Sequence, residues 1–352
     1  MLILAIESSC DETAAAVVEM GEGIRHIRSS VVASQVDTHA LYGGVVPEIA
    51  SRAHIEAISG VVSRSLAEAG VTMEAIDAVG VTYAPGLIGS LLVGVSFAKS
   101  LAFAHGKPLV GVNHIKGHAA AAHLTDPSLE APFCALIVSG GHTSLYDVSS
   151  PTAFHEIGGT RDDAAGEAFD KVGRVMGLPY PGGAAMDRLA ASGFANGRGD
   201  MFRFPSPAVN DASYDYSFSG LKTAVINQIH TIRQRLTLGD DGELPQDIRE
   251  GIAASFTKAV VGGVSAKLRR AIREKNIRRL VMAGGVAANS HLRAAVEAVA
   301  KETGVILTVP PLSLCGDNAA MIGAQAYFEF LAGHLADESL NAYASDEEAD
   351  FV

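Results

Sequence analysis

Two polar-tipped β-hairpin patterns, one near the start of the chain and one about a third of the way along, constrain the fold most strongly. In the first, apolar residues 2–6 and 14–18 flank a polar turn at residues 7–13. In the second, residues 133–138 and 144–148 flank a turn at residues 139–143. Strand-forming runs around polar turns predict hairpins. Because each hairpin begins a long stretch of chain, the pattern predicts two lobes of similar plan.

The remainder of the chain alternates between helical and strand-like patterns. Residues 48–69, 88–103, 167–176, 247–275 and 318–331 have helical spacing of apolar residues, and residues 78–82, 109–112 and 280–283 resemble strands. A length of 352 residues is sufficient for two cores. We therefore predict an α/β protein with an N-terminal lobe at residues 1–130 and a C-terminal lobe at residues 131–352. The last helix is expected to pack back on the first lobe.

Charge and cysteine content limit the location and partners of the chain. The formal net charge of -12 argues against a nucleic-acid binder that uses its whole surface. Seven basic residues between 267 and 279 form either a solvated helix face or a local phosphate contact. Three scattered cysteines do not suggest a disulfide framework. With no pattern of a secretory signal at the start, we expect a cytoplasmic protein that does not bind membranes.

A pair of histidines is the sharpest motif. His114 and His118 follow the predicted strand at residues 109–112, and Asn113 is a good N-cap for a helix. Four helical residues place the two imidazoles about 40° apart on one face, so they can share a metal ion. The alternative is a pair of ordinary surface or packed histidines. Ile115 stands where a zinc peptidase carries its glutamate, which weakens a peptidase hypothesis.

A third metal ligand should come from a distant part of the chain. Asp317 is the best candidate, because it precedes the last helix and would complete a two-histidine, one-carboxylate set with open positions. The alternative role for Asp317 is that of a helix N-cap. His123 lies about 140° around the helix from His118, on a different face, and is not expected to be a ligand.

Three glycine-rich turns indicate nucleotide binding or close packing. Residues 282–289 form a strand end, a glycine turn and a helix start, which suits an anion or a nucleoside edge. Residues 139–141 offer a hydroxyl and backbone N–H groups to a phosphate. Residues 181–183 lie in a third cluster with Asp170, which is either a surface charge or an acceptor for ribose hydroxyls.

Ten stretches, taken in order, resemble the bacterial type of the universal tRNA threonylcarbamoyltransferases, a family once described as glycoprotein endopeptidases. The matching segments are residues 7–13, 43–48, 84–87, 113–118, 138–143, 166–171, 180–183, 217–223, 284–289 and 315–318. The resemblance implies a two-lobed actin-like ATPase fold with duplicated lobes and a central cleft.

The resemblance also implies the site residues. His114, His118 and Asp317 match the metal ligands of the family, with iron(II) as the expected ion and zinc as the alternative. The positions that match its substrate contacts are Ile137, Val138, Ser139, Gly140, Gly141, Asp170, Gly183, Asp187 and Asn289. No general base is evident. Asp11 and Glu12, at the tip of the first hairpin, are weak candidates whose alternative is a solvated turn.

By the same resemblance, the enzyme transfers the threonylcarbamoyl group of threonylcarbamoyl-AMP to the exocyclic amine of the adenosine at tRNA position 37. This adenosine lies next to the anticodon in tRNAs that read codons beginning with A. The implied partners are tRNA, a shorter inactive paralogue of the same fold and a small P-loop ATPase. The alternatives are a metal-dependent endopeptidase, a small-molecule kinase of the same fold and a non-catalytic partner protein.

Overall fold

The computed structural model describes residues 1–239 and 242–346. Contacts group these residues into two compact units, each assembled from more than one segment. The first unit contains residues 1–132, 148–154 and the described residues from 308 onward, and the second contains residues 133–147 and 155–307. Each unit is built around one five-stranded sheet.

The sheet of the first unit has the order β3-β2-β1-β4-β5. Its strands are β1 (Leu2–Glu7), β2 (Glu12–Gly21), β3 (Ile24–Ser34), β4 (Ala78–Ala84) and β5 (Leu109–Asn113). The first three strands pair antiparallel, whereas β4 is parallel to both β1 and β5. The predicted first hairpin is therefore confirmed, and β1 lies at the centre of the sheet.

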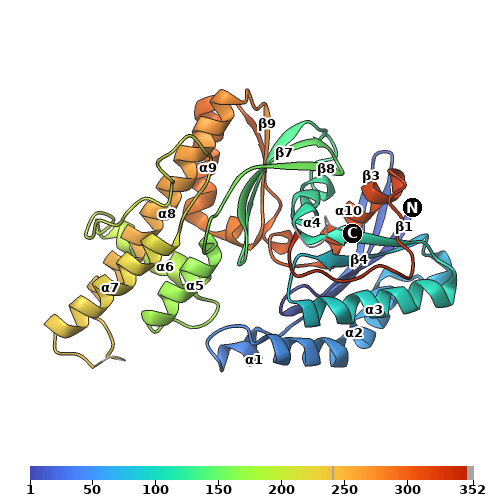
Figure 1. Cartoon of the computed structure of the whole chain (residues 1–352), viewed down its shortest axis with the longest axis horizontal. Helices are drawn as coiled ribbons and strands as arrows, with labels where there is room; N and C mark the ends of the chain where they lie inside the picture. Colours follow the sequence, from blue (N-terminus) through green and yellow to red (C-terminus); the bar gives the residue numbers. More distant parts are fainter. Residues whose placement is uncertain (240–241, 347–352) are drawn as a thin grey trace. The chain divides into compact units, whose positions relative to one another are not determined.

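Alternating side chains of β1 supply two apolar cores, one on each face of this sheet. Leu4 and Ile6 pack in the core with helices α2 (Pro47–Ala69) and α3 (Ile88–His105). Ile3 and Ala5 pack in the core with α10 (Ala319–Leu331), close to α4 (His114–Ala120). Figure 1 shows α2 and α3 along one side of these strands. The first unit also contains α1 (Val36–Ala40) and the 3₁₀ turns η1 (Met73–Ala75), η2 (Ala121–Leu124) and η4 (Leu312–Leu314).

Among the described residues, α3 is the one helix long and apolar enough to cross a membrane by length and composition alone. Its residues Leu91, Val95 and Ala98 are fully or almost fully buried in the core that faces α2. Ile88, Leu92 and Phe103 of the same helix are exposed. One such helix is weak evidence for a membrane span.

The sheet of the second unit repeats the plan, in the order β10-β9-β6-β7-β8. Its strands are β6 (Phe133–Val138), β7 (Thr143–Ser150), β8 (Ala153–Gly159), β9 (Arg279–Ala283) and β10 (Ile306–Thr308). As in the first sheet, three consecutive strands lie together and two later strands extend the sheet beyond the first of them. The pair β6–β9 is parallel, like β1–β4. The prediction of two lobes of similar plan is confirmed.

Five helices and one 3₁₀ turn complete the second unit. They are α5 (Ala165–Val175), α6 (Gly182–Ala195), α7 (Ser219–Arg235), α8 (Gln246–Glu274), α9 (Ser290–Thr303) and η3 (Gly285–Ala288). The long helix α8 packs against α6 and α9, and Figure 1 shows these helices gathered beside β9. Helix α6 begins with Gly182 and Gly183, and α9 follows the glycine turn at residues 284–285, which makes both starts suitable places for a ligand.

Candidate metal centre and nucleotide pocket

Helix α4 presents the two predicted histidines from the end of β5. Asn113 caps the helix, because its side-chain oxygen accepts hydrogen bonds from the backbone N–H groups of Ile115 and Lys116. Gly117 allows α4 to approach α10 closely, since a Cβ at this position would lie 2.7 Å from Cδ1 of Ile322. This packing sets both imidazoles against the start of α10.

His114, His118 and Asp317 converge on one point of the first unit. Oδ1 of Asp317 lies 3.5 Å from Nε2 of His114 and 3.4 Å from Nε2 of His118. The three ligand atoms lie within 4.8 Å of one another, which is a spacing that could hold a metal ion. Asp317 is not the N-cap of α10, because Asn318 fills that position and accepts a hydrogen bond from the N–H of Met321. The alternative that Asp317 acts as a helix cap is therefore wrong.

The residues fit a divalent cation. Both ring nitrogens of His118 are buried and make no hydrogen bond within the part of the chain that the structure describes. Buried polar atoms normally find a partner, and a metal ion would supply one for Nε2. Two imidazoles and a carboxylate suit iron or zinc and leave positions open for substrate oxygens.

Burial and charge affect the two imidazoles in opposite ways. Burial lowers the pKa of His118. It would also lower the pKa of His114, but the negative charges of Asp317 and Glu7 outweigh burial and raise that pKa to about 9. The same carboxylates that favour a proton on His114 favour a cation between the rings.

The tip of the first hairpin carries the two weak candidates for a general base. Asp11 is buried, and Glu12 accepts a hydrogen bond from Ser34 at 3.1 Å. Burial, followed by the negative charges of Asp11 and Asp317, raises the pKa of Glu12 to about 9. The ring of His54 is buried. Its Nδ1 is hydrogen-bonded to Oγ1 of Thr13, and its Nε2 donates to the carbonyl of Cys10, so His54 holds the tip of the first hairpin in place. The alternative of a freely solvated turn is therefore wrong for Asp11.

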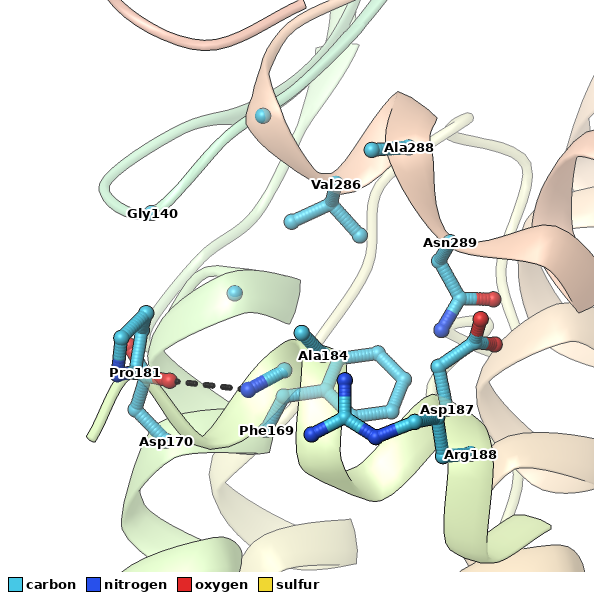
Figure 2. A pocket seen from close by; sticks show the side chains of 13 residues that line it. Gly140, Phe169, Asp170, Pro181, Ala184, Asp187, Arg188, Val286, Ala288 and Asn289 are labelled. Atoms are coloured by element: carbon cyan, nitrogen blue, oxygen red, sulfur yellow. Dashed lines mark hydrogen bonds between the residues drawn. The ribbon is translucent and has the colours of Figure 1, made fainter. Parts of the chain in front are cut away.

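A cavity of 420 Å³ in the second unit collects most of the predicted substrate residues. Gly140, Asp170, Gly183, Asp187 and Asn289 all line it, although they come from four separate parts of the chain. Its remaining lining residues are Gly166, Phe169, Pro181, Ala184, Arg188, Gly285, Val286 and Ala288. Figure 2 shows Asp170 and Pro181 at one end of this cavity and Asp187 and Asn289 at the other.

The acidic residues of this cavity also hold its walls together. Oδ1 of Asp170 accepts hydrogen bonds from the N–H groups of Gly182 at 2.8 Å and Gly183 at 3.3 Å, which ties α5 to the start of α6. Asp187 accepts hydrogen bonds from the backbone and hydroxyl of Ser290 and lies 2.8 Å from Nδ1 of His291. These contacts fix the carboxylates before any ligand binds.

Asn289 has the same double character at the start of α9. Its side-chain oxygen accepts a hydrogen bond from the N–H of Leu292, so it is the N-cap of the helix. In the turn before Asn289, Gly284 has a φ of 96°. Val138 is so close to Gly284 that a Cβ there would lie 2.4 Å from the Val138 carbonyl oxygen. The glycine turn at residues 282–289 is thus required by backbone packing, and it also brings Asn289 to the cavity.

Four predicted substrate positions do not line this cavity. Ile137 and Val138 are fully buried in β6, and Ser139 and Gly141 belong to the following turn. The Ser139 hydroxyl accepts a hydrogen bond from the N–H of His142 and so stabilises that turn. These four residues stay predictions as substrate contacts.

Several residues at both sites were not predicted from the sequence. Phe169, Val286 and Arg188 line the cavity, but as isolated apolar or basic residues they carried no pattern of their own. Glu7 was also missed, although it was the one carboxylate at the end of the first strand. It is fully buried and lies 3.0 Å from Nδ1 of His114.

The basic run at residues 267–279 makes many contacts within the second unit. Lys267 donates to the backbone carbonyls of Val209 and Ser213, and Arg269 and Arg273 both pair with Glu302. Arg270 also bonds backbone carbonyls of the segment before α7. Four of the seven basic residues therefore fasten α8 to that segment and to α9.

Comparison with known proteins identifies close relatives along nearly the whole chain. A family model described as tRNA N6-adenosine threonylcarbamoyltransferase matches residues 26–324. A protein with this name from Moorella thermoacetica is 50% identical over 341 residues, which cover 97% of this chain and 95% of the relative. The protein of that name from Clostridium botulinum is 48% identical over 340 residues, which cover 97% of this chain and 96% of the relative.

Solved structures show the fold alone. The HypF protein of T. kodakarensis superposes with a TM-score of 0.61 at 14% identity and covers 96% of this chain and 49% of its own. A full-length HypF in a phosphate- and nucleotide-bound form gives a TM-score of 0.56 at 14% identity, with 94% and 46% covered. The predicted actin-like α/β fold is confirmed.

Proposed function

Because the chain belongs to the tRNA N6-adenosine threonylcarbamoyltransferase family, we propose that it modifies tRNA by transferring a threonylcarbamoyl group to the adenosine at position 37. The donor is threonylcarbamoyl-AMP. The proposal rests mainly on the 48–50% sequence identity to relatives of that name along almost the whole chain. The presence of all three residues of the His-His-Asp cluster favours an active enzyme over a non-catalytic partner.

The reaction is an acyl transfer that poses two physical problems. The exocyclic amine of adenosine attacks the carbamoyl carbon, the bond from that carbon to the phosphate oxygen breaks, AMP leaves, and the amine loses a proton. The amine is a poor nucleophile, because its lone pair is delocalised into the purine ring. Catalysis therefore depends on close orientation and on stabilising the negative charge that develops on oxygen.

In this proposal, His114, His118 and Asp317 hold one divalent ion, with iron(II) expected and zinc as the alternative. When bound, the ion supplies Lewis acidity toward phosphate and carbamate oxygens. The three side chains keep open positions for those oxygens, because two imidazoles and one carboxylate do not complete a coordination shell. No glutamate stands next to His114 on α4 to activate a water molecule, which disfavours the peptidase alternative.

The cavity of the second unit is proposed to hold the nucleoside part of the donor. Phe169 and Val286 give it apolar surface for a purine, and Asp170 and Asp187 provide acceptors for ribose hydroxyls. Two carboxylates with one nearby cation, Arg188, suit a neutral nucleoside better than a phosphate. The N–H groups of Gly140 and Gly141 are proposed to hold the phosphate, because the N–H of Ser139 already donates to the carbonyl of His142 at 2.7 Å.

Proton removal from the amine is assigned to the tip of the first hairpin, with Asp11 and Glu12 as candidates. A carboxyl group with a pKa of about 9 is protonated near neutral pH, so Glu12 is the weaker acceptor. We propose a cytoplasmic location and, as partners, the shorter inactive paralogue and the small P-loop ATPase.

A reconstituted reaction tests this function. Purified chain is mixed with the enzyme that makes threonylcarbamoyl-AMP, ATP, bicarbonate, radiolabelled threonine and unmodified tRNA, with and without the two partner proteins. We expect label in tRNA only when the chain is present. Label that enters tRNA equally without the chain, or fails to enter even with both partners, would refute the proposal.

A further inference from the structure

The least expected polar group in the first unit is Glu7, a carboxylate with no exposure at the end of β1. An ionised group is costly to bury unless hydrogen bonds and charge compensate it. Glu7 has three such partners. Oε1 accepts from the N–H of Ser9 at 2.5 Å, and Oε2 accepts from the hydroxyl of Thr82 at 2.6 Å and lies 3.0 Å from Nδ1 of His114, which is also 3.1 Å from the hydroxyl of Ser9.

These contacts require Glu7 to be an acceptor. Because Oε1 accepts from Ser9 and Oε2 accepts from Thr82, the carboxylate has no proton to donate, so the proton of the hydrogen bond with His114 belongs to Nδ1. The other nitrogen, Nε2, is the one that lies toward Asp317.

We propose that Glu7 is a positioning residue that fixes the ring of His114 with its proton on Nδ1, so that the lone pair of Nε2 is available to a divalent cation. This inference rests on the proposed metal centre. The two histidines differ in this respect, because Nδ1 of His118 is buried without a hydrogen bond among the described residues. His114 is therefore the ligand whose orientation other side chains control, with Glu7 as the charged acceptor and the Ser9 hydroxyl beside it. A carboxylate behind a metal-binding histidine also raises the basicity of the ring.

The direct test measures metal affinity and does not depend on turnover. Metal-stripped protein is titrated with zinc against a competing chelator, for the wild type, Glu7→Gln and Thr82→Val. Glutamine keeps an oxygen for the N–H of Ser9 but places an NH₂ group opposite Nδ1 of His114. We expect Glu7→Gln to weaken zinc binding by about 10- to 100-fold.

Thr82→Val is the matched control, because it removes a hydrogen bond to the same carboxylate oxygen and keeps the charge and the bond to His114. We expect zinc affinity of this variant within about threefold of the wild type. Equal weakening by the two substitutions would show a merely structural role and overturn the inference. Tight binding by wild type and Glu7→Gln alike would overturn the inference alone, whereas no binding by the wild type would overturn the metal centre as well.

A second measurement decides the question if Glu7→Gln does not fold. Nitrogen-15 spectra of zinc-loaded, histidine-labelled wild type identify which ring nitrogen of His114 bears hydrogen, with His114→Gln used for assignment. A proton on Nδ1 and zinc on Nε2 support the inference. Zinc on Nδ1 contradicts it.

Discussion

Replacing Asp170 separates a structural role in the second unit from a role in ligand binding. One oxygen of this carboxylate accepts the N–H groups of Gly182 and Gly183 at the start of α6, where the N-cap residue Pro181 offers no side-chain acceptor. Hydrogen bonds to a charged group contribute roughly 1.5–3 kcal/mol each, and the 3.3 Å contact is the weaker of the two. Because Asp170 is partly exposed, we expect Asp170→Ala to lower the free energy of unfolding by about 2–3 kcal/mol.

Two further variants sharpen this prediction. Asp170→Asn keeps a neutral acceptor and should cost only about 1 kcal/mol. Asp162 is a matched control, because its Oδ1 accepts the N–H groups of Phe218 and Ser219 at the start of α7, yet it does not line the cavity. Asp162→Ala should therefore lower stability by a similar amount.

The assay combines urea unfolding, followed by circular dichroism, with calorimetric titration of adenosine. We expect Asp170→Ala to lose both stability and adenosine binding, and Asp162→Ala to lose stability while it still binds adenosine. Wild-type stability of Asp170→Ala would refute the capping argument. Equal loss of adenosine binding in both variants would refute a direct contact with the ligand.

Three other predictions concern the backbone, the acid response and the metal. Gly284→Ala should lower the melting temperature, because its φ of 96° is strained for alanine and the new Cβ would lie 2.4 Å from the Val138 carbonyl oxygen. As a control, the new Cβ of Gly285→Ala has no atom within 4 Å, so this variant should melt like the wild type. Burial lowers the pKa of His123 to about 4. Below about pH 6.5 the unfolded chain therefore binds a proton at His123, whereas the folded protein binds it only near pH 4, so the free energy of unfolding should fall by about 3 kcal/mol across that window. His123→Leu should reduce this loss in acid unfolding titrations. An equally steep loss in the variant would contradict the assignment to His123. Zinc at 100 times its dissociation constant should stabilise the wild type by about 2.7 kcal/mol and His118→Ala by much less, as thermal melts with and without chelator would show; an equal gain would place the ion elsewhere.

Local sequence patterns predicted several of the helices and strands, but not the helices α6 and α7. Strong periodicity and clear end signals defined helices such as α2, predicted at residues 48–69 and observed at Pro47–Ala69. The strand β3 was not predicted, because its buried residues alternate with exposed arginine, serine and even isoleucine. Its place at the edge of the sheet, beside β2, explains why so weak a pattern still forms a strand.

Only part of the metal cluster could be predicted from local sequence patterns. The spacing of His114 and His118 follows from helix geometry alone, so the sequence is enough to place them together. Asp317 is about 200 residues away, and only the packing of α4 on α10 brings it to the histidines. Glu7 could not be assigned from sequence, because its partner His114 is distant in the chain and a buried carboxylate looks like any other acidic residue.

Two predicted ligand contacts in the second unit also have a structural role. Asn289 and Asp170 were predicted as ligand contacts, and the structure shows that each also satisfies the backbone at the start of a helix. Such hydrogen bonds depend on where two helices meet, which a linear pattern does not specify. The substrate role of these residues stays a prediction.

The most direct test of the central claim is a single-step transfer from threonylcarbamoyl-AMP to an unmodified tRNA transcript, read out by mass spectrometry of the nucleosides. The reaction contains the metal-loaded chain with its two proposed partners. We predict that one adenosine next to the anticodon gains a threonylcarbamoyl group, and that His114→Ala or metal-stripped protein gives none. Full modification by the metal-stripped protein, or none by the loaded wild type, would contradict the account.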